Sequence, residues 1–145
     1  MRQGDLPDPF TSDIDTSFPK GDALADWLVN VQASMTKGRL TIEEGKHTVS
    51  AVNPMLSRRW IHSATPTAVQ YLTFNTPVAA AAGMECGRLV FTDIHVSARD
   101  FSGRPYPTGC VSPELSPQEK ALEFMLFDLS SCIQPDTEKP QPPIP

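Results

Sequence analysis

The sequence predicts an α/β fold, a small mixed sheet with flanking helices that ends in an amphipathic helix and a proline-rich tail. Two segments, residues 22–37 and 116–131, repeat apolar residues at intervals of three and four, as amphipathic helices do. Short runs between them are rich in β-branched and aromatic residues, which favour strands. The chain of 145 residues is long enough for one domain, and its 15 prolines are about twice the average share, so part of it is expected outside the core.

The first half of the chain contains an irregular segment, a helix and two strands in our prediction. Residues 1–17 are expected to be irregular because their prolines interrupt any period. Asp22 is a good N-cap for the helix, which ends before Gly38. Two short alternating segments, 38–44 and 47–52, then predict a pair of strands.

Three further strands are expected before a long loop. Residues 58–63 and 69–75 have strand composition, and residues 87–96 form an apolar run of the kind that suits a central strand covered on both faces. The loop at 97–115 is longer than compact domains usually contain without a binding role or a crosslink.

The clearest element is the last helix. Ser116 is its N-cap, Pro117 fits its first position, and Glu119 completes a capping box. Apolar residues on more than one face predict a helix packed on more than one side. The segment 134–145 has the proline-rich composition of a linker, so we expect an α/β domain or partial domain over residues 18–133 and another domain downstream.

Charge and composition limit the classes of partner. A formal charge of -5, with no cluster of basic residues beyond Arg58 and Arg59, argues against nucleic acid. No run approaches the 18 apolar residues of a membrane span, and the first 20 residues contain no apolar leader. The cysteines lie more than 20 positions apart, without the spacing of a zinc site, so we expect neither a metal nor a cofactor.

The order of several motifs resembles that of a known fold family. These motifs are FPKGDALADWL, HTVSAVNP, RRWIHS, VQYLTFNTPV, CGRLVFTDIHVS and LSPQEKALEFMLFDLSSC. Together they are similar to the C-terminal segment of secreted bacterial proteins with the ThuA-like or class I glutamine-amidotransferase-like fold. The resemblance covers roughly residues 18–133 and implies a flavodoxin-like half, located outside the cell or in the cell envelope.

The resemblance implies the fold without the family's catalysis. In the amidotransferases the matching strand ends in a histidine, followed two residues later by an acidic residue, and both serve a cysteine nucleophile. His95 matches that histidine, but Ser97 stands at the acidic position. No G-x-C-x-G nucleophile turn is present in the chain.

Asp93 and His95 are the weak candidates for catalysis. Alternation along a strand places both side chains on one face, where the carboxylate could orient the histidine as a general base. The alternative is structural, with His95 bonded to a nearby backbone group and Asp93 capping the long loop. Because a base without a nucleophile or metal is incomplete, we assign no catalytic residue.

The loop and the cysteines supply the other candidate residues. Arg99, Asp100 and Tyr106 belong to the residue types that recognition surfaces use, so they are the predicted ligand-binding residues. If the strand at 87–96 and the last helix run antiparallel, Cys86 and Cys132 meet at one edge and can form a disulfide. The alternative is three reduced cysteines in a cytosolic protein.

The leading hypothesis is a non-catalytic structural or binding module of a secreted multidomain bacterial protein, whose partners are other domains of the same polypeptide. One alternative is a fragment of a hydrolase-like or sugar-related enzyme with His95 near the site. Another is a self-assembling envelope or extracellular protein that forms a homo-oligomer through its sheet edges.

Overall fold

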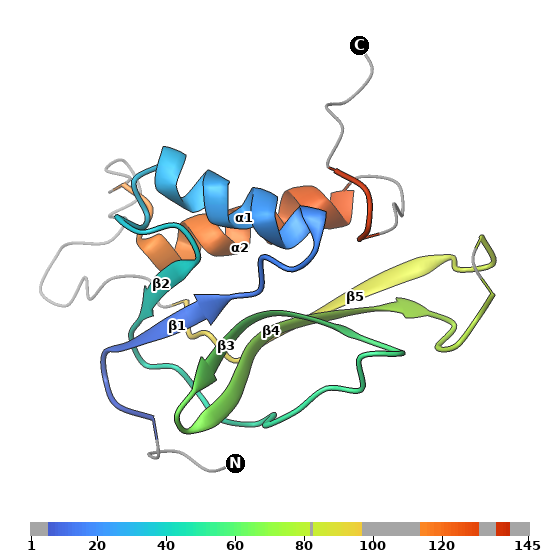
Figure 1. Cartoon of the computed structure of the whole chain (residues 1–145), viewed down its shortest axis with the longest axis horizontal. Coiled ribbons are helices and arrows are strands. Elements are labelled where there is room, and N and C mark those ends of the chain that lie inside the picture. Colours follow the sequence, from blue (N-terminus) through green and yellow to red (C-terminus); the bar gives the residue numbers. More distant parts are fainter. Residues whose placement is uncertain (1–5, 82, 97–113, 131–135, 140–145) are drawn as a thin grey trace, which may run out of the picture.

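Two helices lie side by side across one face of a five-stranded antiparallel sheet (Figure 1). The computed structural model describes residues 6–81, 83–96, 114–130 and 136–139. The elements are β1 (Phe10–Ile14), α1 (Pro19–Asn30), β2 (Arg39–Ile42), β3 (Arg58–Ala64), β4 (Thr67–Thr76), β5 (Gly87–Thr92) and α2 (Pro117–Ser130). Their order across the sheet is β2-β1-β3-β4-β5.

The predicted α/β class is confirmed, but the kind of sheet is different. A flavodoxin-like layer consists of parallel strands joined through crossover helices. Here all four pairings between the described strands are antiparallel. The described sheet is therefore neither mixed nor flavodoxin-like.

The prediction that residues 1–17 are irregular is wrong, because β1 lies inside the sheet between β2 and β3. Phe10, Ser12 and Ile14 are buried and alternate with more exposed neighbours. The polar Ser12 obscures this pattern in the sequence. Its burial is satisfied because its hydroxyl donates a hydrogen bond to the Leu40 carbonyl at 2.8 Å.

The strand predicted at 47–52 is also wrong. This segment belongs to the connection between β2 and β3, and it runs beside the first half of β4, where the Val69 amide donates to the Val49 carbonyl at 2.8 Å. A short run of threonine and valine does not distinguish a strand from an extended connection held by tertiary contacts.

The predicted central strand at 87–96 is an edge strand that ends at Thr92. It pairs only with β4 among the described strands, and Leu89 is 42% exposed. An apolar run suits a strand covered on both sides. Such a run does not show whether neighbouring strands pair with it along one edge or along both.

The last helix has the capping box that its sequence predicts. The Glu119 amide donates to the Ser116 hydroxyl at 3.2 Å, and the Ser116 amide donates to the Glu119 carboxylate at 2.6 Å. Packing on more than one side is not observed, because Leu126 and Phe127 are exposed. The first helix begins at Pro19, three residues before the expected cap, since proline already has the φ angle of a first helical turn.

Trp60 lies at the centre of the core between the sheet and the helices. Its side chain is fully buried, with the Phe18 ring edge-on at 5.0 Å and the Phe124 ring at 6.4 Å between centroids. Because the ring is buried, Trp60 has its role in the core. None of the described helices has both the length and the apolar character needed to cross a membrane.

Candidate functional site

Asp93 is a structural residue that holds a loop against the sheet. It lies just beyond β5 and is only 7% exposed. Its carboxylate accepts a hydrogen bond from the Thr48 amide at 2.7 Å, and its carbonyl accepts one from the Lys46 amide at 2.8 Å. Its own amide donates to the Gln70 carbonyl in β4 at 2.9 Å. Asp93 thus has a structural role, but its observed partners lie at residues 46–48 and in β4, and the predicted contact with the loop at 97–115 lies outside the described residues.

His95 is paired with a different carboxylate from the one expected. Its Nδ1 atom lies 2.6 Å from the Glu44 carboxylate, and both side chains are about half exposed to solvent. The expectation that Asp93 orients His95 depended on strand alternation. The strand ends at Thr92, so that alternation does not continue to His95.

The His95 groove is a recess of about 340 Å³ between the end of β2 and the start of α2. Its lining residues are Thr41, Glu43, Glu44, His95, Val96, Ser116, Pro117, Gln118 and Glu119. The buried Gln118 side chain fixes its wall, because it bonds both the amide and the carbonyl of Glu43 and the carbonyl of His95.

The groove has a proton-transfer pair but an incomplete catalytic set. A histidine beside a carboxylate can accept or release a proton. The Ser116 hydroxyl is already used as the helix cap, and within the described ranges no hydroxyl or thiol is bonded to His95. No cluster of three metal-ligating side chains is found in those ranges.

The remaining predicted site residues lie outside the described residues. Arg99, Asp100 and Tyr106 belong to the segment 97–113, and Cys132 belongs to 131–135. Cys86, at the start of β5, is exposed and has no disulfide partner in the described part of the chain. The ligand-binding role of the loop and the Cys86–Cys132 disulfide therefore stay predictions.

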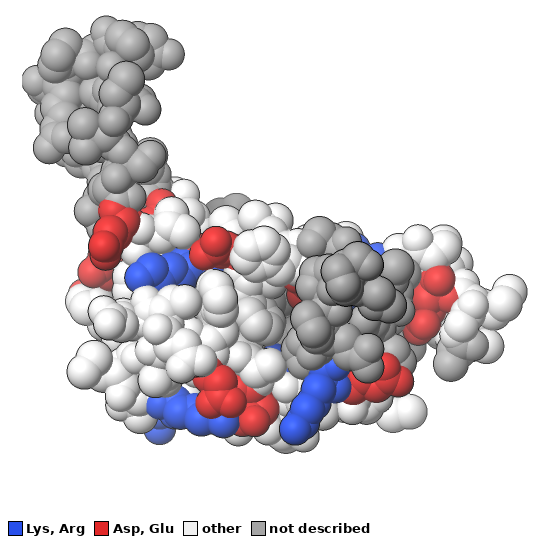
Figure 2. Space-filling model, turned by 90° about the horizontal axis from the view of Figure 1, so that it is seen from above, with Lys and Arg blue, Asp and Glu red and all other residues white. Residues whose placement is uncertain are grey.

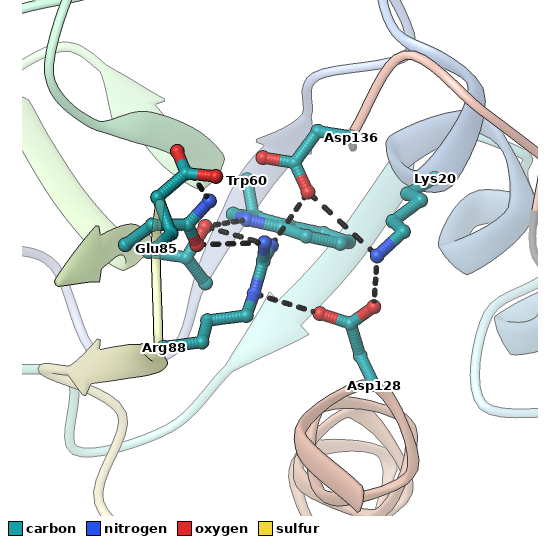
Figure 3. A network of polar contacts seen from close by, with 8 residues as sticks. Lys20, Trp60, Glu85, Arg88, Asp128 and Asp136 are labelled. Atoms are coloured by element: carbon teal, nitrogen blue, oxygen red, sulfur yellow. Dashed lines mark hydrogen bonds and ion pairs between the residues drawn. The ribbon is translucent and has the colours of Figure 1, made fainter. Parts of the chain in front are cut away.

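Sequence reasoning missed a buried charge network, defined here as Lys20, Arg88, Asp128 and Asp136 (Figure 3). Lys20 Nζ lies 2.7 Å from Asp128 Oδ1 and 3.9 Å from Asp136 Oδ1. Arg88 contacts the other Asp128 oxygen at 3.0 Å and Asp136 at 2.6 Å. The side chains are 3%, 5%, 8% and 16% exposed, in the order of the definition. Two positive and two negative groups thus balance one another.

The network is connected to the aromatic core. The Arg88 guanidinium lies 5.8 Å from the centre of the Trp60 ring, and it donates to the Thr73 hydroxyl at 3.1 Å. The same hydroxyl accepts the Trp60 indole N–H at 2.8 Å. No sequence motif predicts these contacts, because Lys20 and Asp128 are 108 positions apart.

The hairpin cavity is a second recess, of about 190 Å³, near the end of the β4–β5 hairpin that projects beyond the helices (Figure 1). Its lining residues are Pro54, Met55, Leu56, Ser57, Arg58, Thr73, Phe74, Asn75, Pro77, Ala79, Ala80, Glu85 and Asp136. Asp136 therefore belongs both to the cavity wall and to the charge network.

Charges of both signs are interspersed on the face of the molecule that carries the helices (Figure 2). Lys37, for example, lies 2.7 Å from Asp22 and 2.8 Å from Asp26 in α1. The described part of this face has no broad basic area of the kind that a phosphate backbone needs.

No protein-family model matches this chain, and neither the curated proteins nor the solved structures contain a significant match to it.

Proposed function

We propose that this chain is a non-catalytic binding module of a larger secreted bacterial protein. The role of Asp93 carries the proposal, because the carboxylate nearest in sequence to His95 is buried and bonded to the Thr48 amide. It is therefore not free to serve a reaction. Two recesses in the surface, the His95 groove and the hairpin cavity, offer places for a ligand.

The extracellular location and the other domains of the polypeptide are parts of the same proposal. They are supported by the proline-rich composition of residues 134–145 and by the motif resemblance. The antiparallel sheet does not strengthen the resemblance to ThuA-like proteins, and the binding role does not depend on it.

An enzyme fragment is the second candidate, and the 2.6 Å contact between His95 and Glu44 favours it. Such a pair could act as a general base if another part of the protein supplied a nucleophile. The two candidate functions assign different roles to His95. A binding module needs no proton transfer from it, whereas an enzyme does.

We expect no hydrolysis of chromogenic esters or glycosides that depends on His95. The measurement compares the wild-type chain, His95→Ala and Glu44→Gln by rate and by melting temperature, in the longest available form of the protein. Because both side chains are about half exposed, the variants are expected to melt near the wild type. A wild-type rate that both substitutions abolish without unfolding would establish the enzyme instead.

Self-assembly through a sheet edge is the remaining candidate. β2 and β5 are the outer strands of the described sheet, so each has one edge that no described strand covers. A binding module is expected to stay monomeric. Light scattering after size exclusion, repeated over a range of concentrations, distinguishes the two, since edge pairing would raise the mass with concentration.

A further inference from the structure

Two charged side chains that line the hairpin cavity have no ion partner in the described part of the chain. Arg58 is partly buried, and its guanidinium lies 5.0 Å from the centre of the Phe18 ring. Glu85 is also partly buried, and its carboxylate accepts one hydrogen bond, from the Asn75 amide at 3.3 Å. Neither contact neutralises a charge.

In the neighbouring charge network, opposite charges compensate one another. Lys20 and Arg88 are both paired with aspartates in the network (Figure 3). Partly buried charges lose hydration, and an opposite charge normally compensates for that loss. Arg58 and Glu85 have no such compensation within the described residues, and both border the hairpin cavity.

The cavity has walls of two kinds. Most of the surface that faces the cavity is polar, with charged and amide groups from Arg58, Glu85 and Asn75, and a smaller apolar wall comes from Met55, Leu56, Phe74 and Pro77. Its volume of about 190 Å³ is smaller than the roughly 300 Å³ at which pockets for drug-sized ligands begin. The occupant must therefore be small.

We propose that the hairpin cavity binds a small zwitterion of the α-amino acid type with a short apolar side chain. The Arg58 guanidinium has the fork of N–H donors that binds a carboxylate through two hydrogen bonds. The Glu85 carboxylate accepts hydrogen bonds from the ammonium group, and the apolar wall receives the side chain. The inference rests on the proposed binding role and names its ligand class.

The test is binding of free L-alanine and L-valine to the intact chain, measured by calorimetry and by ligand-observed NMR. Both amino acids are expected to bind, and the N-acetylated amino acid and the matching amine, which each lack one charge, are expected to bind at least about tenfold more weakly. Binding of neither amino acid at millimolar concentration would overturn the ligand class. Binding of the singly charged analogues with the same affinity as the amino acids would also overturn the ligand class.

Binding measurements on single-residue variants test whether the ligand occupies the hairpin cavity. Arg58→Met and Glu85→Gln are each expected to weaken binding at least about tenfold, because each leaves one ligand charge unpaired. Arg58→Lys keeps the charge and is expected to retain part of the affinity, which separates a binding effect from a loss of folding. Arg59→Met is the matched control, because Arg59 pairs with Asp15 at 3.6 Å and does not line the cavity.

Unchanged affinity in both Arg58→Met and Glu85→Gln would overturn the assignment to this cavity. That result is distinct from failure of the proposed function, which would appear as catalysis that depends on His95, in the groove lined by other residues. Circular dichroism and melting curves of every variant accompany the binding data.

Discussion

Replacing Asp128 by asparagine is expected to lower the free energy of unfolding by about 3–5 kcal/mol. The substitution keeps the shape of the side chain but removes the carboxylate that both Lys20 and Arg88 contact. Asp136 alone then faces two buried positive charges. Because the network joins the start of α1, β5 and the end of α2, the loss is expected in the global unfolding transition, measured in urea by circular dichroism.

Asp26→Asn is the control for this effect. Asp26 also pairs with a lysine, at 2.8 Å, but both partners are largely exposed, so water screens the pair. We expect only a small change in the urea midpoint. Similar midpoints for Asp128→Asn and Asp26→Asn would show that the buried network contributes no more than a surface ion pair.

The second large effect is expected for Trp60→Ala, with a loss of about 3–5 kcal/mol. The substitution opens a cavity at the centre of the core and removes the ring contacts with Phe18 and Phe124. It also removes the aromatic face beneath the Arg88 guanidinium. Guanidinium chloride unfolding measures the loss, and the unfolding slope tests whether the transition stays two-state.

Trp60→Phe separates the packing from the hydrogen bond. Phenylalanine retains much of the apolar volume but cannot donate to the Thr73 hydroxyl, so a smaller loss than for alanine is expected. A loss for Trp60→Ala no greater than that for Trp60→Phe would contradict a central role of the ring in the core.

Elements with strong local signals could be predicted from the sequence. The last helix is one, because its cap and its first turn are made by residues within four positions of each other. Strands β3 and β4 are others, since their composition and length already separate them from helices. In each, short-range residue pairs carry most of the information.

Elements that depend on distant partners could not be predicted. Burial of Ser12 in β1 is favourable only because the Leu40 carbonyl lies within reach. Among the described strands, β5 pairs only with the second half of β4, and the connection between β2 and β3 runs beside the first half. Neither fact follows from the local pattern of apolar and polar residues.

The candidate site could be predicted only in part, because some of its contacts also join residues that are far apart in the sequence. The sequence drew attention to Asp93 and His95, and it allowed a structural role for Asp93. It could not reveal that Glu44, 51 positions from His95, is the carboxylate that His95 contacts. The charge network had no signal at all, because single lysine, arginine and aspartate residues are common on surfaces.

The central claim is that Asp93 holds the fold together and does not serve a reaction. The most direct measurement compares the free energies of unfolding of Asp93→Ala and His95→Ala. We predict a loss of about 1–3 kcal/mol for Asp93→Ala, because the Thr48 amide loses its acceptor in a partly buried hydrogen bond, and a much smaller loss for the half-exposed His95. An Asp93→Ala variant as stable as the wild type would contradict the claim.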